Sequence, residues 1–297
     1  MAGLSAVDAA LEGVRLIRAK PRVVLLWALY YFAFLIVLEG IAYFTLGGHM
    51  AELLAAMREP PTEPTALERL IHTVTPFILI AGAAGAVFQS MFTAAIYRKV
   101  LNPDEAHSGL RLGLDELRLL AVFALLLLLP AAMVFVDTYL FLVTASLPDN
   151  MLTVTFVALA VIATWVAVVV ALVRLSLVGA ATISLGRLAI PEGWRLSAGH
   201  FARLLGAYVL ATALSVLTLA VMNFVARVVF GVVGRLLSRG AATHGAGTAT
   251  LIASLALEIV VALVVACSYV ILLAPPAAAY LALAGETLEP EGAAQAD

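Results

Sequence analysis

The chain carries little charge for its length. Only 12% of its 297 residues are Asp, Glu, Lys or Arg, whereas about 25% is usual for a soluble globular domain. Hydrophobic residues make up 64% of the chain. This small number of charges cannot cover a surface that faces water, which excludes an ordinary soluble fold. We therefore expect an integral membrane protein. The net charge of −2 also provides no field that would attract nucleic acid.

Cysteine and clustered histidine are also scarce. The single cysteine, Cys267, lies in an apolar segment, which excludes a disulfide framework and a cysteine-based metal site. None of the five histidines has another histidine at the spacing of a local metal site. The sequence also has no nucleotide-binding loop, zinc-protease, serine-hydrolase or EF-hand pattern. We therefore expect no metal and no cofactor, and an enzyme is the least favoured class of function.

Long apolar segments recur six times along the chain. Each has about the 20 residues that a helix needs to cross ~30 Å of hydrocarbon. The predicted spans are residues 23–46, 74–97, 119–142, 152–173, 205–226 and 251–273. The sequence therefore predicts an all-α bundle of six transmembrane helices. This bundle forms a single membrane domain over residues 1–284, followed by a disordered acidic tail at 285–297.

Residues 4–18 show a different pattern. Apolar side chains recur at three- and four-residue spacing, and charged side chains occupy the other side. This spacing predicts an amphipathic helix that lies at the membrane surface. Similar amphipathic stretches, 113–120 and 194–205, lead into the third and fifth spans. We therefore expect interfacial helices at the cytoplasmic face of the bundle.

Basic residues are distributed unequally between the two sides of the predicted bundle. Twelve of the 17 Lys and Arg residues lie in the N-terminal segment and in the connections after the second and fourth spans. The other five follow the first and fifth spans. Because cytoplasmic connections carry an excess of Lys and Arg, both termini are predicted to be cytoplasmic.

Two of the cytoplasmic connections contain longer recognisable strings. They read YRKVLNPDE followed by LRLGLDELRLL, and VRLSLVGAATISLGRLAIPEGWRLSAGHFARLL. These strings resemble uncharacterised six-span inner-membrane proteins of alphaproteobacteria. The layout is also loosely similar to the group that contains the membrane domain of glycerophosphodiester phosphodiesterases. The resemblance implies a six-span fold in a bacterial inner membrane. It implies no reaction, because the phosphodiesterase activity of that group belongs to a soluble domain.

Three acidic side chains, Glu39, Asp137 and Glu258, fall well inside predicted spans. A charge near the bilayer centre costs at least ~2.5 kcal/mol. Each of these acids is therefore expected to have a function. At 1.5 Å per residue, all three lie roughly 6–9 Å from the midplane, on the outer side. With Gln89 nearer the midplane, they form a candidate intramembrane polar site. Either each acid bonds separately to a neighbouring helix, or they share a proton or cation site in an outward cavity.

A basic stripe follows the fifth span. Arg227, Arg235 and Arg239 recur at multiples of four residues, which predicts that the span continues as an amphipathic helix. Such arginines either extend to outer-leaflet phosphates or form a surface that binds lipid head groups or an acidic partner.

Small residues fill positions 81–86 of the second span, which read AGAAGA and include Gly82 and Gly85. Small residues let helices approach closely in lipid. The segment therefore predicts that the second span is a closely packed central helix. The alternative is a thin wall beside a substrate path.

These features favour a non-enzymatic integral inner-membrane protein that acts through contacts with lipids or with a partner membrane protein. The alternative is a small proton- or cation-coupled transporter that uses Glu39, Asp137 and Glu258. The sequence leaves the oligomeric state, the partner and any substrate open.

The predicted orientation can be tested with topology reporters fused after His49 and after Asn102. We expect the first fusion to report the outer side and the second to report the cytoplasm, because of the twelve-to-five distribution of basic residues. An external signal at Asn102 would show that the orientation is reversed.

Overall fold

A computed structural model of the chain describes residues 5–58, 63–105, 109–144, 150–240 and 246–293. For residues 57, 229, 230, 232–240, 246–254 and 286–293 it describes the backbone alone. Throughout these ranges every regular element is a helix and no strand occurs. The predicted all-α fold is therefore confirmed.

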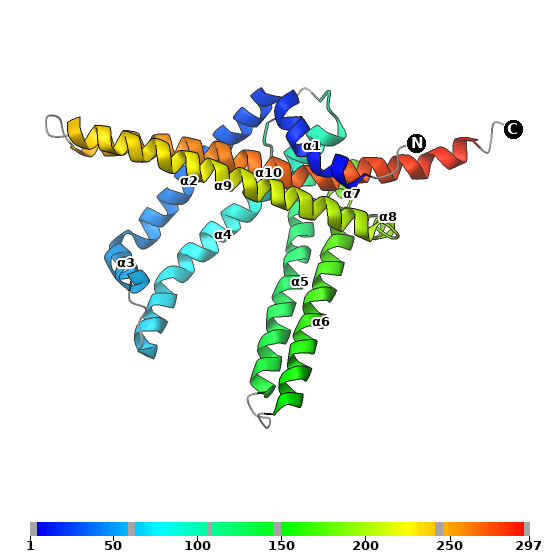
Figure 1. Ribbon diagram of the computed structural model, residues 1–297, viewed down its shortest axis with the longest axis horizontal. Coiled ribbons are helices and arrows are strands. Elements are labelled where there is room, and N and C mark those ends of the chain that lie inside the picture. Colours follow the sequence, from blue (N-terminus) through cyan, green and yellow to red (C-terminus); the bar gives the residue numbers. More distant parts are fainter. Residues whose placement is uncertain (1–4, 59–62, 106–108, 145–149, 241–245, 294–297) are drawn as a thin grey trace. The chain divides into compact units, whose positions relative to one another are not determined.

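The helices follow one another with short connections (Figure 1). In chain order they are α1 (Ala6–Ala19), α2 (Pro21–Leu46), the 3₁₀ turn η1 (Gly47–His49), α3 (Met50–Arg58), α4 (Pro64–Leu101), α5 (Leu114–Thr144), α6 (Met151–Leu175), α7 (Val178–Leu185), α8 (Ile190–Leu196), α9 (Phe201–Gly240) and α10 (Ala246–Ala293).

Six helical segments are long and apolar enough to cross a membrane. They are Pro21–Ala56, Pro64–Leu101, Leu114–Thr144, Met151–Leu185, Phe201–Val228 and Leu255–Gly285. Each contains most or all of one predicted span, so the chain is a multi-pass membrane protein.

Two helices extend beyond their predicted spans. The basic stripe predicts that the fifth span continues, and α9 runs on to Gly240. The sequence predicts a disordered tail from residue 285, whereas α10 is described as helical to Ala293.

The chain's internal contacts divide it into two compact units. Unit 1 comprises Met1–Ala19, Thr93–Ser215 and Val270–Asp297, and unit 2 comprises Lys20–Phe92 and Val216–Tyr269. The helices α4, α9 and α10 each contribute residues to both units.

Helix α1 has the predicted amphipathic character and packs within unit 1. It buries Ala9, Ala10 and Leu16, and a Cβ atom at Gly13 would lie only 2.5 Å from the Cα atom of Ile271. The backbones of α1 and α10 therefore touch at this glycine. On the exposed face, a hydrogen bond from Arg15 lowers the pKa of the Asp8 carboxyl. This ion pair therefore persists to lower pH than the ordinary pKa of Asp would allow.

The short helices α7 and α8 also pack closely at a glycine. A Cβ atom at Gly193 would lie 2.7 Å from the Cα atom of Val178. Helix α7 ends at Gly186, whose left-handed φ of 61° is the usual geometry of a glycine C-cap. The Arg174 guanidinium lies 5.2 Å from the ring centre of Trp194. This contact joins the end of α6 to α8.

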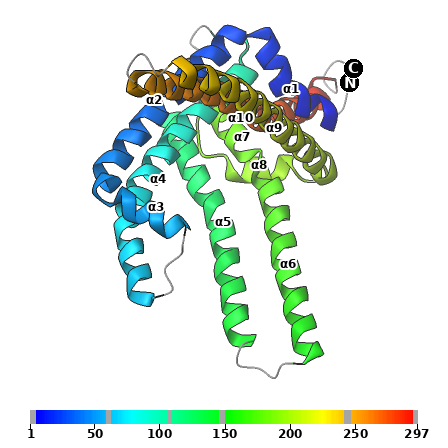
Figure 2. The same ribbon diagram turned by 60° about the vertical axis from the view of Figure 1, so that its left-hand side comes forward.

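Helices α5 and α6 form an antiparallel hairpin that extends from the rest of unit 1 (Figure 2). Asn150 caps the start of α6 by accepting a hydrogen bond from the backbone N–H of Thr153 at 2.9 Å. At the other end of the hairpin, α5 packs against α7, and a Cβ atom at Gly179 would lie 3.2 Å from the Leu119 side chain.

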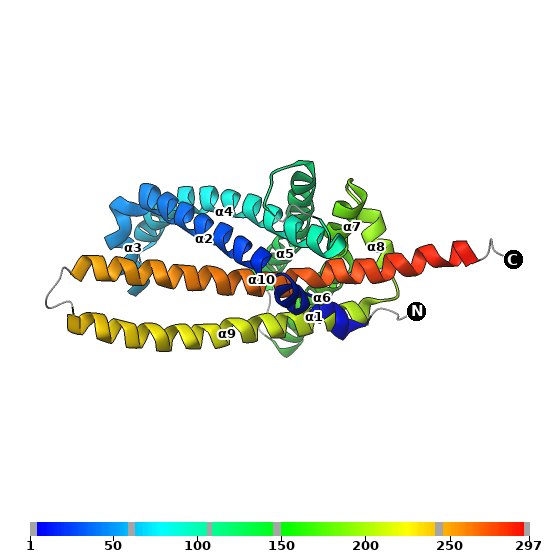
Figure 3. The same cartoon turned by 90° about the horizontal axis from the view of Figure 1, so that it is seen from above.

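Unit 2 is organised around aromatic side chains from α2, α4 and α10. Phe34 stacks on Phe88 with ring centres 4.2 Å apart, and Trp27 and Phe92 are almost fully buried. The ring centre of Tyr269 lies 6.0 Å from that of Tyr31. Such pairs stabilise a fold by about 0.5–1.5 kcal/mol beyond their buried area. In this unit, α9 and α10 also run antiparallel beside each other (Figure 3).

The predicted close packing of the second span at Gly82 and Gly85 is wrong. A Cβ atom at either glycine would meet no atom within 4 Å. Small residues allow two helices to approach but do not draw them together. In α4 the packing contacts come instead from the aromatic residues one or two turns further along the helix.

The glycines therefore predict opposite effects of the same substitution. We expect Gly13→Ala to destabilise the fold by about 1–3 kcal/mol, because the added methyl group overlaps the α10 backbone. Gly82→Ala should be neutral or stabilising by up to ~1 kcal/mol, because alanine is the better helix former. Thermal unfolding of the purified protein in detergent measures both. Equal melting of G13A and the parent would contradict the contact between α1 and α10.

Candidate functional site

Two of the three intramembrane acids come together in unit 2. Glu39 on α2 and Glu258 on α10 lie close enough for their carboxyl groups to interact electrostatically. Glu258 Oε2 is shielded from solvent and has no partner of its own among the described residues. A hydrogen bond between two carboxyl groups requires that one of them carries a proton. The pair is therefore a candidate site for a proton.

The aromatic residues position this pair of acids. Glu39 lies little more than one turn beyond Phe34 on α2, and the stacking of Phe34 on Phe88 fixes α2 against α4. The contact between Tyr31 and Tyr269 fixes α2 against α10. These aromatic contacts hold α2, α4 and α10 together next to the two acids, so these three helices could line a polar site. Gln89, next to Phe88, is half-buried and has a partner in the structure.

Asp137 belongs to the other unit. It lies on α5 in the α5–α6 hairpin, and its Oδ1 atom is shielded from solvent without a hydrogen-bond partner among the described residues. The structure therefore brings Glu39 and Glu258 together and does not place Asp137 with them. A site shared by all three acids stays a prediction.

The predicted basic stripe lies on α9. Arg227 is exposed, and the backbone at Arg235 and Arg239 is helical, but their side chains lie outside the described part of the structure. The stripe as a surface for lipid or for an acidic partner stays a prediction.

The sequence analysis missed a buried ion pair in unit 1. Arg98, at the end of α4, donates a hydrogen bond to Glu116, in the first turn of α5. These residues are 6% and 1% exposed. From sequence, Arg98 counted only as a basic residue that sets orientation, and Glu116 was not singled out. Because the partners are 18 residues apart, no periodic signal connects them.

The acid pair predicts a thermodynamic coupling. We expect Glu39→Gln and Glu258→Gln to change the free energy of unfolding non-additively, with a coupling of about 0.5–3 kcal/mol, because each acid loses the same partner. Denaturant unfolding in detergent measures this double-mutant cycle. The cycle of Glu39→Gln with Glu52→Gln, an exposed acid on α3 that is paired with His49, serves as the additive control. Additivity in both cycles would show that the two carboxyl groups act separately.

Chemistry that requires a metal has no obvious site in the described residues, where no three His, Cys, Asp or Glu side chains come together. Comparison of the chain with protein-family models, with curated proteins and with solved structures found no match.

Proposed function

We propose that this protein is a non-enzymatic integral membrane protein that acts by binding a partner membrane protein through its α5–α6 hairpin. Lipid surrounds the remainder of its apolar surface. The observation that supports this proposal is the exposure of the hairpin. Two of its side chains on α5, Phe135 and Phe141, are 74% and 71% exposed, and Met151 and Leu152 on α6 are 87% and 82% exposed.

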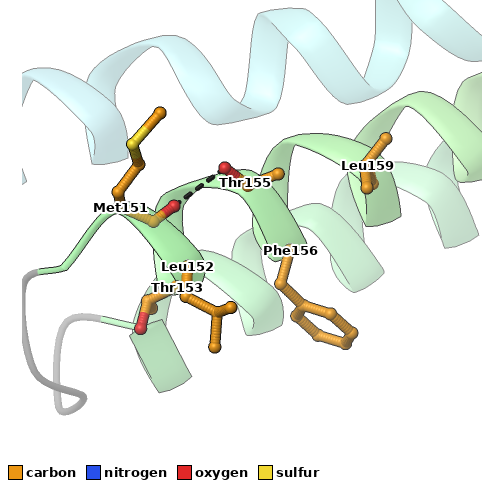
Figure 4. A pocket seen from close by; sticks show the side chains of 6 residues that line it. All are labelled: Met151, Leu152, Thr153, Thr155, Phe156 and Leu159. Carbon is orange, nitrogen blue, oxygen red and sulfur yellow. Dashed lines mark hydrogen bonds between the residues drawn. The ribbon is translucent and has the colours of Figure 1, made fainter.

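The start of α6 also carries an open apolar surface, which borders about 830 Å³ of space. Its lining residues come from the first turns of this one helix (Figure 4): Met151, Leu152, Thr153, Thr155, Phe156 and Leu159. The Thr155 hydroxyl donates a hydrogen bond to the Met151 carbonyl oxygen at 2.8 Å, so this hydroxyl is satisfied within the helix. The surface that remains is apolar and suits either an acyl chain or the side chains of another helix.

Asp137 favours a protein partner over lipid. Its Oδ1 atom has no hydrogen-bond partner in the described residues, and acyl chains offer no donor. Polar side chains between transmembrane helices typically hydrogen bond across the helix interface. Because Oδ1 is shielded by the chain's own atoms, a partner helix with a donor at the depth of Asp137 would satisfy it once the side chain turns outward. The hairpin would then present an apolar surface with one polar contact that sets register.

A transporter is the second candidate function, and the contact between Glu39 and Glu258 favours it. Two interacting carboxyl groups on different helices can bind and release a proton as one group. In a proton-coupled transporter that uses Glu39, Asp137 and Glu258, this pair would be the coupling site. We also propose that the protein resides in a bacterial inner membrane with both termini in the cytoplasm, on the basis of its basic residues and its resemblance to six-span proteins.

A photocrosslinking side chain at position 156, used in native membranes, tests the proposed function. We expect a protein adduct of discrete mass, and Asp137→Leu should lower its yield roughly threefold or more, since an interhelical hydrogen bond contributes about 0.6–2 kcal/mol. The control is the same side chain at position 44, where Phe44 is 87% exposed at the outer end of α2.

Two results would contradict a partner-binding hairpin. The first is the recovery of lipid adducts alone at positions 156 and 44. The second is proton-coupled uptake in proteoliposomes that is abolished by Glu39→Gln and by Glu258→Gln, because that result would establish the transporter instead.

A further inference from the structure

A buried arginine stands at the junction of α4 and α5 in unit 1. One terminal nitrogen of Arg98, Nη1, donates to Glu116 Oε1. The other, Nη2, is shielded from solvent and has no hydrogen-bond partner among the described residues. A buried charged donor without a partner is costly. This nitrogen is therefore a candidate to bind a ligand.

A second guanidinium group reaches the same carboxylate. Arg111 Nε lies 4.0 Å from Glu116 Oε1, the oxygen that already accepts from Arg98. Arg111 Nη2 lies 3.9 Å from Glu105 Oε1, which is too long for a direct hydrogen bond. The same buried oxygen of Glu116 thus faces two guanidinium groups. Each guanidinium group keeps N–H donors that this oxygen does not bind.

The neighbouring carboxylate of Asp115 has a partner of its own. Asp115 accepts a hydrogen bond from Arg118 at 2.7 Å. The two arginines differ in exposure, because the Arg111 side chain is 54% exposed whereas Arg98 is buried. A ligand would therefore meet Arg111 first, and it would reach the shielded Nη2 atom of Arg98 only after a local opening of the cluster.

The chemistry of the donors defines the ligand class. Guanidinium groups present planar forks of N–H donors that match the oxygens of phosphate, and they do so better than the point charge of lysine. The first turn of α5 adds the positive end of a helix dipole. An oxyanion with several acceptor oxygens can bridge the two arginines, whereas a further single carboxylate would repeat the contact that Glu116 already makes.

We propose that Arg98 and Arg111 form a phosphate-binding site at the junction of α4 and α5. The occupant is the phosphate group of an anionic phospholipid or a soluble phosphate. This site does not depend on the α5–α6 hairpin binding a partner, and neither of its arginines lies in the surface assigned to that partner.

The test uses the purified full-length protein and two probes. Inorganic phosphate is titrated calorimetrically against the protein in detergent, and retention of phosphatidylglycerol over phosphatidylcholine is measured by native mass spectrometry. Binding of inorganic phosphate alone would identify a soluble ligand. Retention of phosphatidylglycerol that inorganic phosphate does not displace would identify the lipid. Either result supports the site, and the absence of both would overturn it.

Matched variants separate a built site from general electrostatic attraction. Arg111→Gln should weaken binding at least about tenfold, since hydrogen bonds to charged groups are strong. Arg118→Gln removes the same charge close by and should leave binding unchanged. Arg98→Lys keeps the charge but loses the fork and should also weaken binding. Because Arg111 is half-exposed, its variant should fold even if Arg98→Lys does not. Equal weakening by Arg111→Gln and Arg118→Gln would overturn the proposal.

Discussion

Every polar group that this chain carries into the membrane needs a partner within the protein, because hydrocarbon offers none. Helix formation satisfies the hydrogen bonds of the backbone N–H and C=O groups. Threonine hydroxyls within the helices also find their partners inside the protein. The hydroxyls of Thr45, Thr138 and Thr164 each donate to the carbonyl oxygen one turn earlier, at 2.7–3.0 Å. These side chains are therefore tolerated in spans whose other residues are almost all apolar. The constraint also explains why the few ionisable residues within the spans stand out.

Within the described residues of the six spans, three ionisable side chains meet this constraint only in part. Asp137, Glu258 and Arg98 each retain one shielded atom without a hydrogen-bond partner. Their surroundings differ, and each points to a different chemistry. Asp137 lies on an exposed hairpin, where a donor from another helix would complete it once the side chain turns outward. Glu258 faces a second carboxyl group, with which it can share a proton. Arg98 lies beside a second arginine, where an oxyanion would complete both.

Helix packing in the two units depends on different residues. In unit 1 the closest approaches occur at glycines, where α1 meets α10 and where α7 meets α8. In unit 2 the aromatic side chains of α2, α4 and α10 make the contacts instead. The glycines that look most suited to close packing, Gly82 and Gly85, have open space around them. Gly13, which lies in an unremarkable amphipathic segment, makes the tightest approach. Composition therefore shows where close packing is permitted but not where it occurs.

The sequence by itself determined the all-α class, the six spans, the amphipathic N-terminal helix and the continuation of the fifth span. Each of these depends on the periodicity or length of an apolar segment, which is a local property of the chain. It also singled out Glu39 and Glu258, because a charge inside an apolar run is visible without any contact. Only the tertiary structure decided that these two acids interact, that Arg98 is buried against Glu116, and that Gly13 rather than Gly82 is a contact point. Those outcomes depend on the rotation and crossing of helices, which are set by side chains far apart in the chain.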